Sequence, residues 1–502
     1  MELVKLNSSL ISALTIVLLL QPGWFCSCQS QKPNLVFVYV DDWGFADVGF
    51  RNPAIKSPNF DALASTGSVL QRHYVFKYCS PSRASFLTGR WPHHAHQWNM
   101  PPGTMAGTNL NMTMLPAKLK QAGYSTHMVG KWHQGFFKSH YLPTSRGFDT
   151  MSGFLNGGET HMTEVNSGLT DFWKNRAPDP RNGTYDAYHY RSDLVDMIAN
   201  HESNTPLFLY LPLHNVHGPF QAPQEWLDIY PNNTCSKRHT YQAMVSVADN
   251  VTGTVVELLK AKDMWKNTLM VVSADNGGAP CGGSNYPLKG SKGTFFEGGV
   301  RSLAFVNGGL LPDAMRGKDI DGFIHTADWY PTFCKLAGVE ADDSGPGRYP
   351  VDGLDVWPIL SGQTNATAHQ SIILGFNFSE ANSGAVIMGD YKLVVGVQGT
   401  DCDNLMYSPL DYPCTQGPKA ANCDPYCLYD IVSDPHEKTD LSKSQPDTLK
   451  KLLDEYNKFS SEPQSTRDQG YHSQGDLPND LKNAKKVLDA KGGYWMPWRD
   501  EQ

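Results

Sequence analysis

The 502-residue sequence contains no run of basic residues, and its formal net charge at pH 7 is −8. A nucleic-acid-binding protein needs a basic patch or stripe, so this class is excluded. After residue 20 no stretch reaches the roughly 18 uninterrupted apolar residues that a membrane-spanning helix requires, and we expect no membrane anchor. Internal repeats and low-complexity tracts are also missing. Hydrophobic residues make up 40% of the chain, which is long enough to bury a large core.

Cysteines are few, and none forms a CxxC pair. Outside the first thirty residues the chain has Cys79, Cys235, Cys281, Cys334, Cys402, Cys414, Cys423 and Cys427. The four that crowd into 402–427 predict a disulfide-stapled loop region, and a zinc cluster there is the less favoured alternative. Setting Cys79 aside leaves seven cysteines. Because seven is an odd number, at least one other thiol is unpaired.

The HExxH zinc motif is missing as well. The histidine-rich stretch WPHHAHQW (91–98) has neither that spacing nor a carboxylate nearby in the sequence. We therefore predict a structural or pocket-lining role for it rather than zinc binding. Zinc would instead favour a phosphatase-like two-metal hydrolase.

The N-terminus has the features of a secretory signal peptide. Lys5 precedes an apolar run at 10–20, and small residues follow up to Cys28. A buried helix is the alternative, but a run this short at the start of the chain favours a signal peptide over residues 1–28. We therefore expect the secretory pathway, with the protein either secreted or lysosomal. Candidate glycosylation sequons begin at Asn111, Asn182, Asn232, Asn250, Asn365 and Asn377.

Four continuous apolar runs, at 34–40, 125–130, 207–213 and 268–274, predict strands buried on both faces of a parallel sheet. Helix-like segments at 113–123 and 241–262 lie between them, which favours an α/β layered fold. Ligands bind beyond the carboxyl ends of the strands in such folds. Each run leads there into polar side chains: Asp41 and Asp42; Lys131 and His133; His214 and His217; Asp275 and Asn276.

The chain changes character after about residue 365. A short hairpin is predicted over 383–396 and an amphipathic helix over 447–460. We expect a catalytic α/β domain over 29–365 and a smaller C-terminal α+β domain over 366–502.

The strand-end side chains suggest a site for a hard cation and an anion. Calcium and magnesium prefer oxygen ligands, and four are offered by Asp41, Asp42, Asp275 and Asn276. Cations are offered by Arg83, Lys131 and Lys292, which together with His133 and His217 suit a tetrahedral anion with a leaving group to protonate. The alternative is a set of unrelated surface acids and solvated loop lysines.

Cys79 stands in KYCSPSRASFLTGR (77–90). A disulfide needs no such neighbours, and a thiolate nucleophile would want a histidine partner. Zinc would want more cysteine or histidine ligands close by. The local residues alone fit none of these three roles well.

The stretch CSPSRASFLTGR (79–90) resembles the first signature of the type I sulfatases, and GYSTHMVGKWH (123–133) resembles their second. The similarity continues through DDWG (41–44), RGFD (146–149), NVHGP (215–219), ADNGG (274–278) and LYD (428–430). It covers nearly the whole chain after the signal peptide. The wording is most similar to the arylsulfatase B-like branch, whose known substrates include sulfated galactosamine in glycosaminoglycans.

This resemblance implies an alkaline-phosphatase-like fold, with a mixed, mostly parallel sheet flanked by helices. It implies that a formylglycine-generating enzyme reads Pro81 and Arg83 and oxidises Cys79 to formylglycine, whose hydrate supplies the nucleophilic oxygen. One calcium ion would be held by Asp41, Asp42, Asp275, Asn276 and the modified Cys79.

The resemblance also assigns roles to the cations and histidines. Arg83 and Lys131 would orient the aldehyde hydrate, and Lys131 would also bind substrate. Lys292 and His217 would contact sulfate and assist the departing alcohol. His133 would deprotonate the second hydroxyl so that sulfate is expelled, and His214 is treated as non-catalytic.

Three functions follow in order of preference. The first is a calcium-dependent sulfuric ester hydrolase acting on a sulfated small molecule or glycan. The second is a formylglycine-dependent phosphodiesterase or phosphonate monoester hydrolase. The third is a catalytically inactive secreted binding protein. Neither the natural sulfate ester nor the oligomeric state is predicted.

Overall fold

The computed structural model describes residues 31–96, 98–181, 183–230, 236–280, 282–345, 349–367, 369–377, 383–398, 422–462 and 477–499. Several predictions lie outside these residues: the signal peptide, the sequons at Asn182 and Asn232, and the states of Cys235, Cys281, Cys402 and Cys414. Among the described sequons, Asn111 and Asn365 are exposed and Asn250 is half-buried.

The four apolar runs form adjacent parallel strands, as predicted. They are β11 (Thr268–Ala274), β1 (Asn34–Val40), β10 (Leu207–Leu213) and β4 (Ser125–Lys131), in that spatial order. The sheet continues beyond β4 with the parallel strand β5 (Thr150–Phe154), then β8 (Trp173–Lys174) and β9 (Ala177–Pro178). Beyond β11 lie β13 (Ala304–Asn307), which is antiparallel, β2 (Ser68–Leu70) and β14 (Lys318–Ile320). The sheet is therefore mixed but parallel at its centre.

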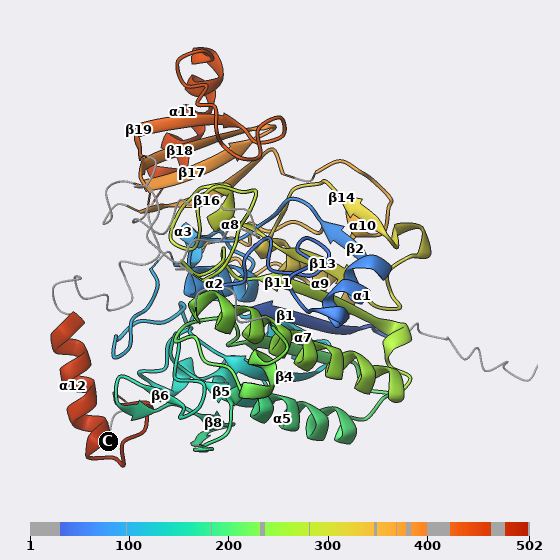
Figure 1. Cartoon of the computed structure of the whole chain (residues 1–502), viewed down its shortest axis with the longest axis vertical. Coiled ribbons are helices and arrows are strands. Elements are labelled where there is room, and N and C mark those ends of the chain that lie inside the picture. The colour runs from blue at the N-terminus through green and yellow to red at the C-terminus, as the bar shows by residue number, and fades with distance from the viewer. Residues whose placement is uncertain are drawn as a thin grey trace, which may run out of the picture. The chain divides into compact units, whose positions relative to one another are not determined.

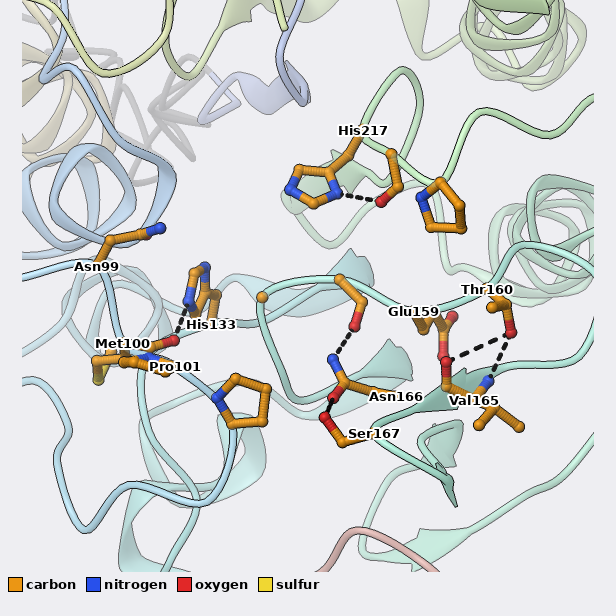
Figure 2. A pocket seen from close by; sticks show the side chains of 15 residues that line it. Asn99, Met100, Pro101, His133, Glu159, Thr160, Val165, Asn166, Ser167 and His217 are labelled. Carbon is orange, nitrogen blue, oxygen red and sulfur yellow. Dashed lines mark hydrogen bonds between the residues drawn. The ribbon is translucent and has the colours of Figure 1, made fainter. Parts of the chain in front are cut away.

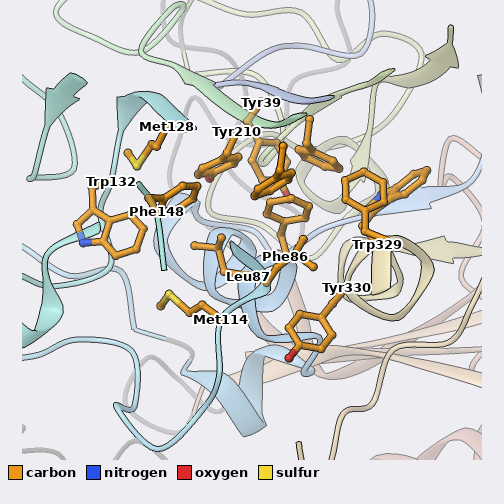
Figure 3. Close-up of a cluster of buried hydrophobic side chains, with 14 of the residues drawn as sticks. Tyr39, Phe86, Leu87, Met114, Met128, Trp132, Phe148, Tyr210, Trp329 and Tyr330 are labelled. Carbon is orange, nitrogen blue, oxygen red and sulfur yellow. The ribbon is translucent and has the colours of Figure 1, made fainter. Parts of the chain in front are cut away.

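Alternate side chains of β1 point into two different hydrophobic clusters, because successive strand residues face opposite sides of a sheet. Phe37 and Tyr39 join a cluster with helices α2 (Cys79–Thr88), α4 (Leu115–Gln121) and α9 (Trp329–Ala337). Figure 3 shows Tyr39 in this cluster with Phe86 and Trp329. Burying each such side chain contributes about 1.5–3 kcal/mol.

The other face of the sheet, with Val36 and Val38, packs on α1 (Pro58–Thr66), α5 (Asp186–Asn200) and α7 (Ser236–Ala261). Figure 1 shows α5 and α7 running side by side over it. The prediction of an α/β fold is confirmed, and helices α4 and α7 cover most of the two predicted helical segments.

The smaller elements complete the picture. Short strands are β3 (His73–Tyr74), β12 (Arg301–Ser302) and β15 (Ile324–His325) in one sheet, and β6 (Val165–Asn166) and β7 (Leu169–Thr170) in another. Short helices are α3 (Pro92–Ala95), α6 (Gln224–Leu227), α8 (Glu297–Val300) and α10 (Trp357–Leu360). Within the described part of the chain, no helix is both long enough and apolar enough to cross a membrane.

A four-stranded antiparallel sheet lies near the C-terminus. It consists of β16 (Ser371–Asn377), β17 (Ser383–Met388), β18 (Tyr391–Val397) and β19 (Asn422–Asp430). The predicted hairpin is confirmed as β17–β18, and the predicted amphipathic helix as α11 (Pro446–Ser460), which packs on the sheet. A disulfide joins Cys423 to Cys427 within β19. Cys79 and Cys334 are buried free thiols, so Cys334 is an unpaired thiol besides Cys79.

The last described helix, α12 (Leu477–Asp489), packs elsewhere. Its Ala484 and Leu488 belong to the cluster that also contains Trp132, next to β4. The predicted domain boundary at residue 365 stays a prediction.

Candidate active site at the carboxyl ends of the central strands

The predicted oxygen ligands meet at one edge of the sheet. Asp41 and Asp42 follow β1, and Asp275 and Asn276 follow the neighbouring strand β11. We call these four residues the oxygen cluster. All are buried, and the backbone N–H of Asp42 donates to Asp275 at 3.2 Å. Because the strands are parallel and in register, their ends place these side chains together.

Two features of the oxygen cluster point to a bound cation. One carboxylate oxygen each from Asp41, Asp42 and Asp275 lies within 4.8 Å of the others and of Cys79 Sγ. The Asn276 Oδ1 atom is buried and has no hydrogen-bond partner among the described residues, while its Nδ2 donates to Asp42. Burial and the neighbouring Asp41 raise the pKa of Asp275 to about 6. Oxygen donors in this arrangement fit a hard cation such as calcium or magnesium.

Three buried or half-buried cations surround the oxygen cluster: Arg83, Lys131 and Lys292. We call them the cationic set. The Arg83 guanidinium donates from Nε at 3.0 Å and Nη2 at 2.7 Å to Asp275. Lys131 Nζ lies 2.6 Å from Asp41, and Lys292 Nζ lies 2.7 Å from Asp42. Burial opposes the charge on Lys292, but Asp42 outweighs it and raises the pKa of this lysine.

Cys79 lies at the first position of α2, beside the oxygen cluster. Its Sγ is 3.3 Å from Asp41 Oδ1 and 3.9 Å from Asp42 Oδ1. Burial and Asp41 raise the pKa of the thiol, so the thiolate form is disfavoured. The side chain sits where the strand-end groups converge, in a place poorly suited to thiolate chemistry.

A cavity of about 500 Å³ opens beside these residues and is lined by both predicted histidines. His133 and His217 lie on different sides of it, as Figure 2 shows. His133 Nε2 donates to the Met100 carbonyl at 2.8 Å, and its buried Nδ1 has no hydrogen-bond partner among the described residues. His217 Nδ1 donates to the Gly218 carbonyl at 2.6 Å, and its Nε2 lies 3.8 Å from Asp42. Each ring thus keeps one nitrogen for another partner.

Both histidines are held in their neutral form. Burial and Lys131 lower the pKa of His133, while burial and Lys292 lower that of His217 to about 3. His133 and Asp42 also have positive φ values, 54° and 56°. Such backbone is uncommon outside glycine and occurs at functional sites.

Sequence reasoning missed Gly157 and Gly158, which lie between the histidines. A Cβ at Gly157 would lie 2.6 Å from His133 Cε1, and one at Gly158 would lie 2.9 Å from His217 Cε1. Any side chain there would displace a ring. The pair of glycines, 24 residues after His133 (157 minus 133), was the available signal.

A buried cluster behind His217 was also missed. His161 donates from Nε2 to the His217 carbonyl at 3.0 Å and from Nδ1 to Asp186 at 3.0 Å. Asp186 also accepts from His214 Nδ1 at 2.8 Å. The adjacent Glu159 lines the cavity, and neither of its carboxyl oxygens has a hydrogen-bond partner among the described residues. His214 therefore has a structural partner, in keeping with its treatment as non-catalytic.

The histidine-rich stretch does not line the cavity: His93, His94 and His96 are all outside its lining. The prediction of a pocket-lining role is wrong for these three, because their rings turn toward other partners. His96 Nε2 lies 3.4 Å from the Ser80 hydroxyl, and His94 contacts Asp352 and Glu462.

Known proteins resemble the chain over most of its length. The sulfatase family model matches residues 33–339. The Mus musculus protein "Arylsulfatase J" is 33% identical over 507 residues, covering 94% of this chain and 81% of that protein. The Mus musculus "N-acetylgalactosamine-6-sulfatase" is 30% identical over 374 residues, covering 68% and 69%. The solved structure "Crystal structure of Ps i-CgsB in complex with k-i-k-neocarrahexaose" has a TM-score of 0.75 and 28% identity, covering 92% of this chain and 99% of that one.

These matches confirm the predicted fold class, an alkaline-phosphatase-like sulfatase fold with a small C-terminal antiparallel sheet. They agree with a site that gathers an anion-binding cationic set, an oxygen cluster and two neutral histidines at one sheet edge. The chain belongs to the sulfatase family and is a sulfuric ester hydrolase.

Proposed function

We propose that this protein hydrolyses the sulfate ester of a carbohydrate, using a formylglycine formed from Cys79 and one calcium ion. The observation that carries the proposal is the convergence of three carboxylates and the unpartnered Asn276 Oδ1 on Cys79. When formed and hydrated, formylglycine supplies a nucleophilic oxygen, which a buried cysteine with a raised pKa does not.

The oxygen cluster fits a divalent cation by charge as well as by donor type. Its three carboxylates are balanced by the three members of the cationic set, and His133 and His217 are neutral, so the residues alone sum to zero. A bound calcium ion would add two positive charges to the site, which favours a sulfate anion there. Asp41, Asp42, Asp275 and Asn276 would hold it.

His133 is suited to accept a proton at Nδ1. Its Nε2–H is fixed by the Met100 carbonyl, so the lone pair is on Nδ1, and this atom has no other hydrogen-bond partner in the described chain. Lys131 and Arg83 place positive charge beside Cys79 through Asp41 and Asp275. We assign His133 as the base that releases sulfate, and Arg83 and Lys131 as groups that orient the nucleophile.

His217 and Lys292 are suited to the other side of the sulfate. Both contact Asp42, and His217 presents Nε2 to the cavity side of the site. An anionic substrate raises the pKa of a nearby histidine, so binding itself promotes protonation at Nε2. We assign His217 to the departing alcohol and Lys292 to a sulfate oxygen.

The cavity suits a polyhydroxylated alcohol. Its lining combines hydroxyl and amide side chains with prolines, and includes no lysine or arginine: Asn99, Thr160, Asn166, Ser167, Pro101 and Pro219. Such groups exchange hydrogen bonds with sugar hydroxyls without adding charge. One relative is named an N-acetylgalactosamine sulfatase, and the solved structure at 28% identity holds a carrageenan-type hexaose by its title.

The finer assignments belong to this proposal. They are the arylsulfatase B-like branch, the C-terminal domain from residue 366, passage through the secretory pathway to the exterior or the lysosome, and modification by a formylglycine-generating enzyme. The motifs at 79–90 and 123–133 and the signal-peptide pattern support them.

The proposal is tested by comparing substrates. Protein made in a eukaryotic secretory host is assayed with an aryl sulfate, an aryl phosphate and a panel of sulfated glycosaminoglycans, scored by kcat/KM. We expect the aryl sulfate to be preferred over the phosphate and at least one sulfated glycan to exceed both. Preference for the phosphate would support the phosphoryl alternative, and no turnover of any ester would support an inactive binding protein.

A further inference from the structure

The helix α3 carries two histidines that meet a carboxylate far away in the chain. Glu462, just after α11, has its Oε2 at 2.8 Å from His94 Nε2 and 3.9 Å from His93 Nε2. The three ligand atoms lie within 4.8 Å of one another. None of these residues lines the cavity of the proposed active site. We propose that His93, His94 and Glu462 form a zinc site that ties α3 to the end of α11.

The separations fit a tetrahedral zinc ion. Zinc–nitrogen and zinc–oxygen bonds of about 2.0–2.1 Å put neighbouring tetrahedral ligand atoms about 3.3 Å apart. The two observed nitrogen–oxygen distances, 2.8 and 3.9 Å, bracket that value. Two imidazoles and one carboxylate are a ligand set that zinc accepts. A water molecule can complete the fourth position, because the Glu462 side chain is 32% exposed.

His93 is the observation that points independently to a ligand. It is 1% exposed, and neither ring nitrogen has a hydrogen-bond partner among the described residues. Its ring packs against Phe376 of β16 and Phe459 of α11, and its Nε2 points at Glu462. Leaving a buried polar group unpaired costs about 1–3 kcal/mol. A metal ion at this place would satisfy the open nitrogen.

Asp352 supplies the outer support that zinc-bound histidines usually have. It accepts from His94 Nδ1 at 2.8 Å and from the backbone N–H of Trp91 at 2.8 Å. The first contact puts the proton of His94 on Nδ1, so the lone pair is on Nε2, toward Glu462. Carboxylate–histidine–zinc arrangements orient the ring in this way. The competing explanation is a metal-free ion pair, with a His94 imidazolium between Asp352 and Glu462.

Equilibrium dialysis separates these explanations. Full-length protein, stripped with a zinc-selective chelator, is dialysed against Zn²⁺ with calcium in excess to occupy the oxygen cluster, and bound zinc is counted by elemental analysis. We compare the wild type with Glu462→Gln, His93→Gln and Asp352→Asn. The matched control is His140→Gln, since His140 is an exposed histidine outside the cluster.

We expect one zinc ion per wild-type and His140→Gln chain, and its loss in Glu462→Gln and His93→Gln. Asp352→Asn should bind about 10–100-fold more weakly. Zinc should raise the Tm of the wild type but not that of Glu462→Gln, whose partly exposed position makes folding of the variant straightforward. The proposal fails if the wild type keeps no zinc, if both ligand variants bind as well as the wild type, or if zinc leaves the wild-type Tm unchanged.

Discussion

Replacing Asp186 by asparagine tests whether the buried cluster behind His217 positions that residue. Asp186 accepts hydrogen bonds from His161, from His214 and from the backbone N–H of Ala187, at 2.7–3.0 Å for the shortest contact to each. Asparagine has only one accepting oxygen, and its amide would face a histidine N–H. At least one ring must then turn or shift its proton. Because His161 also holds the His217 carbonyl, the change reaches the active site.

Two magnitudes follow from this geometry. Breaking a buried ion pair by removing one partner costs about 3–5 kcal/mol of stability, and both Asp186 and His161 are fully buried. Proton transfer by one positioned side chain is worth ~10²–10⁴-fold in rate. If Asp186 acts only through His217, Asp186→Asn cannot lower kcat by more than His217→Ala does.

The stability effect has a defined pH dependence. Burial opposes the charge on Asp186, but His161 outweighs it and holds the pKa of Asp186 below its ordinary value; burial likewise opposes the charge on His161, but Asp186 raises its pKa. The aspartate contribution is present above about pH 4 and lost at lower pH. The histidine contribution is present below about pH 6.5 and lost as pH rises through the raised pKa. The gap between wild type and variant should therefore be largest near pH 5–6 and shrink in alkali.

The assay combines denaturant unfolding with kcat for a carbohydrate sulfate and for a nitrophenyl sulfate. Asp193→Asn is the matched control, because Asp193 lies on the same helix, is buried, and pairs with Arg181 and Ser152 rather than with His161. We expect both variants to lose stability and only Asp186→Asn to lose kcat, mainly for the poorer leaving group. An equal loss of kcat from Asp186→Asn in the wild-type and His217→Ala backgrounds would refute the positioning role.

Three further predictions concern the proposed active site. Cys79→Ser should keep the wild-type Tm and lose turnover, and peptide mass spectrometry of the active wild type should find the aldehyde at position 79; a plain cysteine in fully active protein would contradict this. Asp275→Asn should lose calcium and activity together, as elemental analysis and kcat will show, and retention of stoichiometric calcium would count against the oxygen cluster. His217→Ala should slow esters with poor leaving groups far more than nitrophenyl esters, so an equal loss across a leaving-group series would reject its assignment to the alcohol.

The centre of the fold could be predicted because its strands carry an unambiguous pattern. A run such as NLVFVYV (34–40) is apolar at every position, which only a strand covered on both faces requires. The edges of the same sheet were not predicted, since β8, β9 and β12 are two-residue strands with no pattern of their own. The packing of α12 on the large cluster also depends on long-range contacts that local periodicity does not encode.

The strand-end residues of the site were found for a geometric reason. Parallel neighbours in register deliver the residues after them to one edge, so Asp41 and Asp275 had to meet once β1 and β11 were adjacent. Asp186 begins a helix and His161 lies in a loop, and no register relates such positions. Only the HNVH spacing near His217 hinted that a second histidine had a partner.

The same distinction explains why the histidine-rich stretch was misjudged. The sequence around His93 and His94 contains no acid, and zinc was disfavoured for that reason. The carboxylates that approach these rings come from Asp352 and Glu462, the latter 368 positions after His94. Local spacing therefore excludes only a metal site built within one segment. Where a helix such as α3 packs against the end of a distant one, absent neighbours in the sequence carry no weight, and an unpaired buried ring becomes the more reliable sign of a ligand.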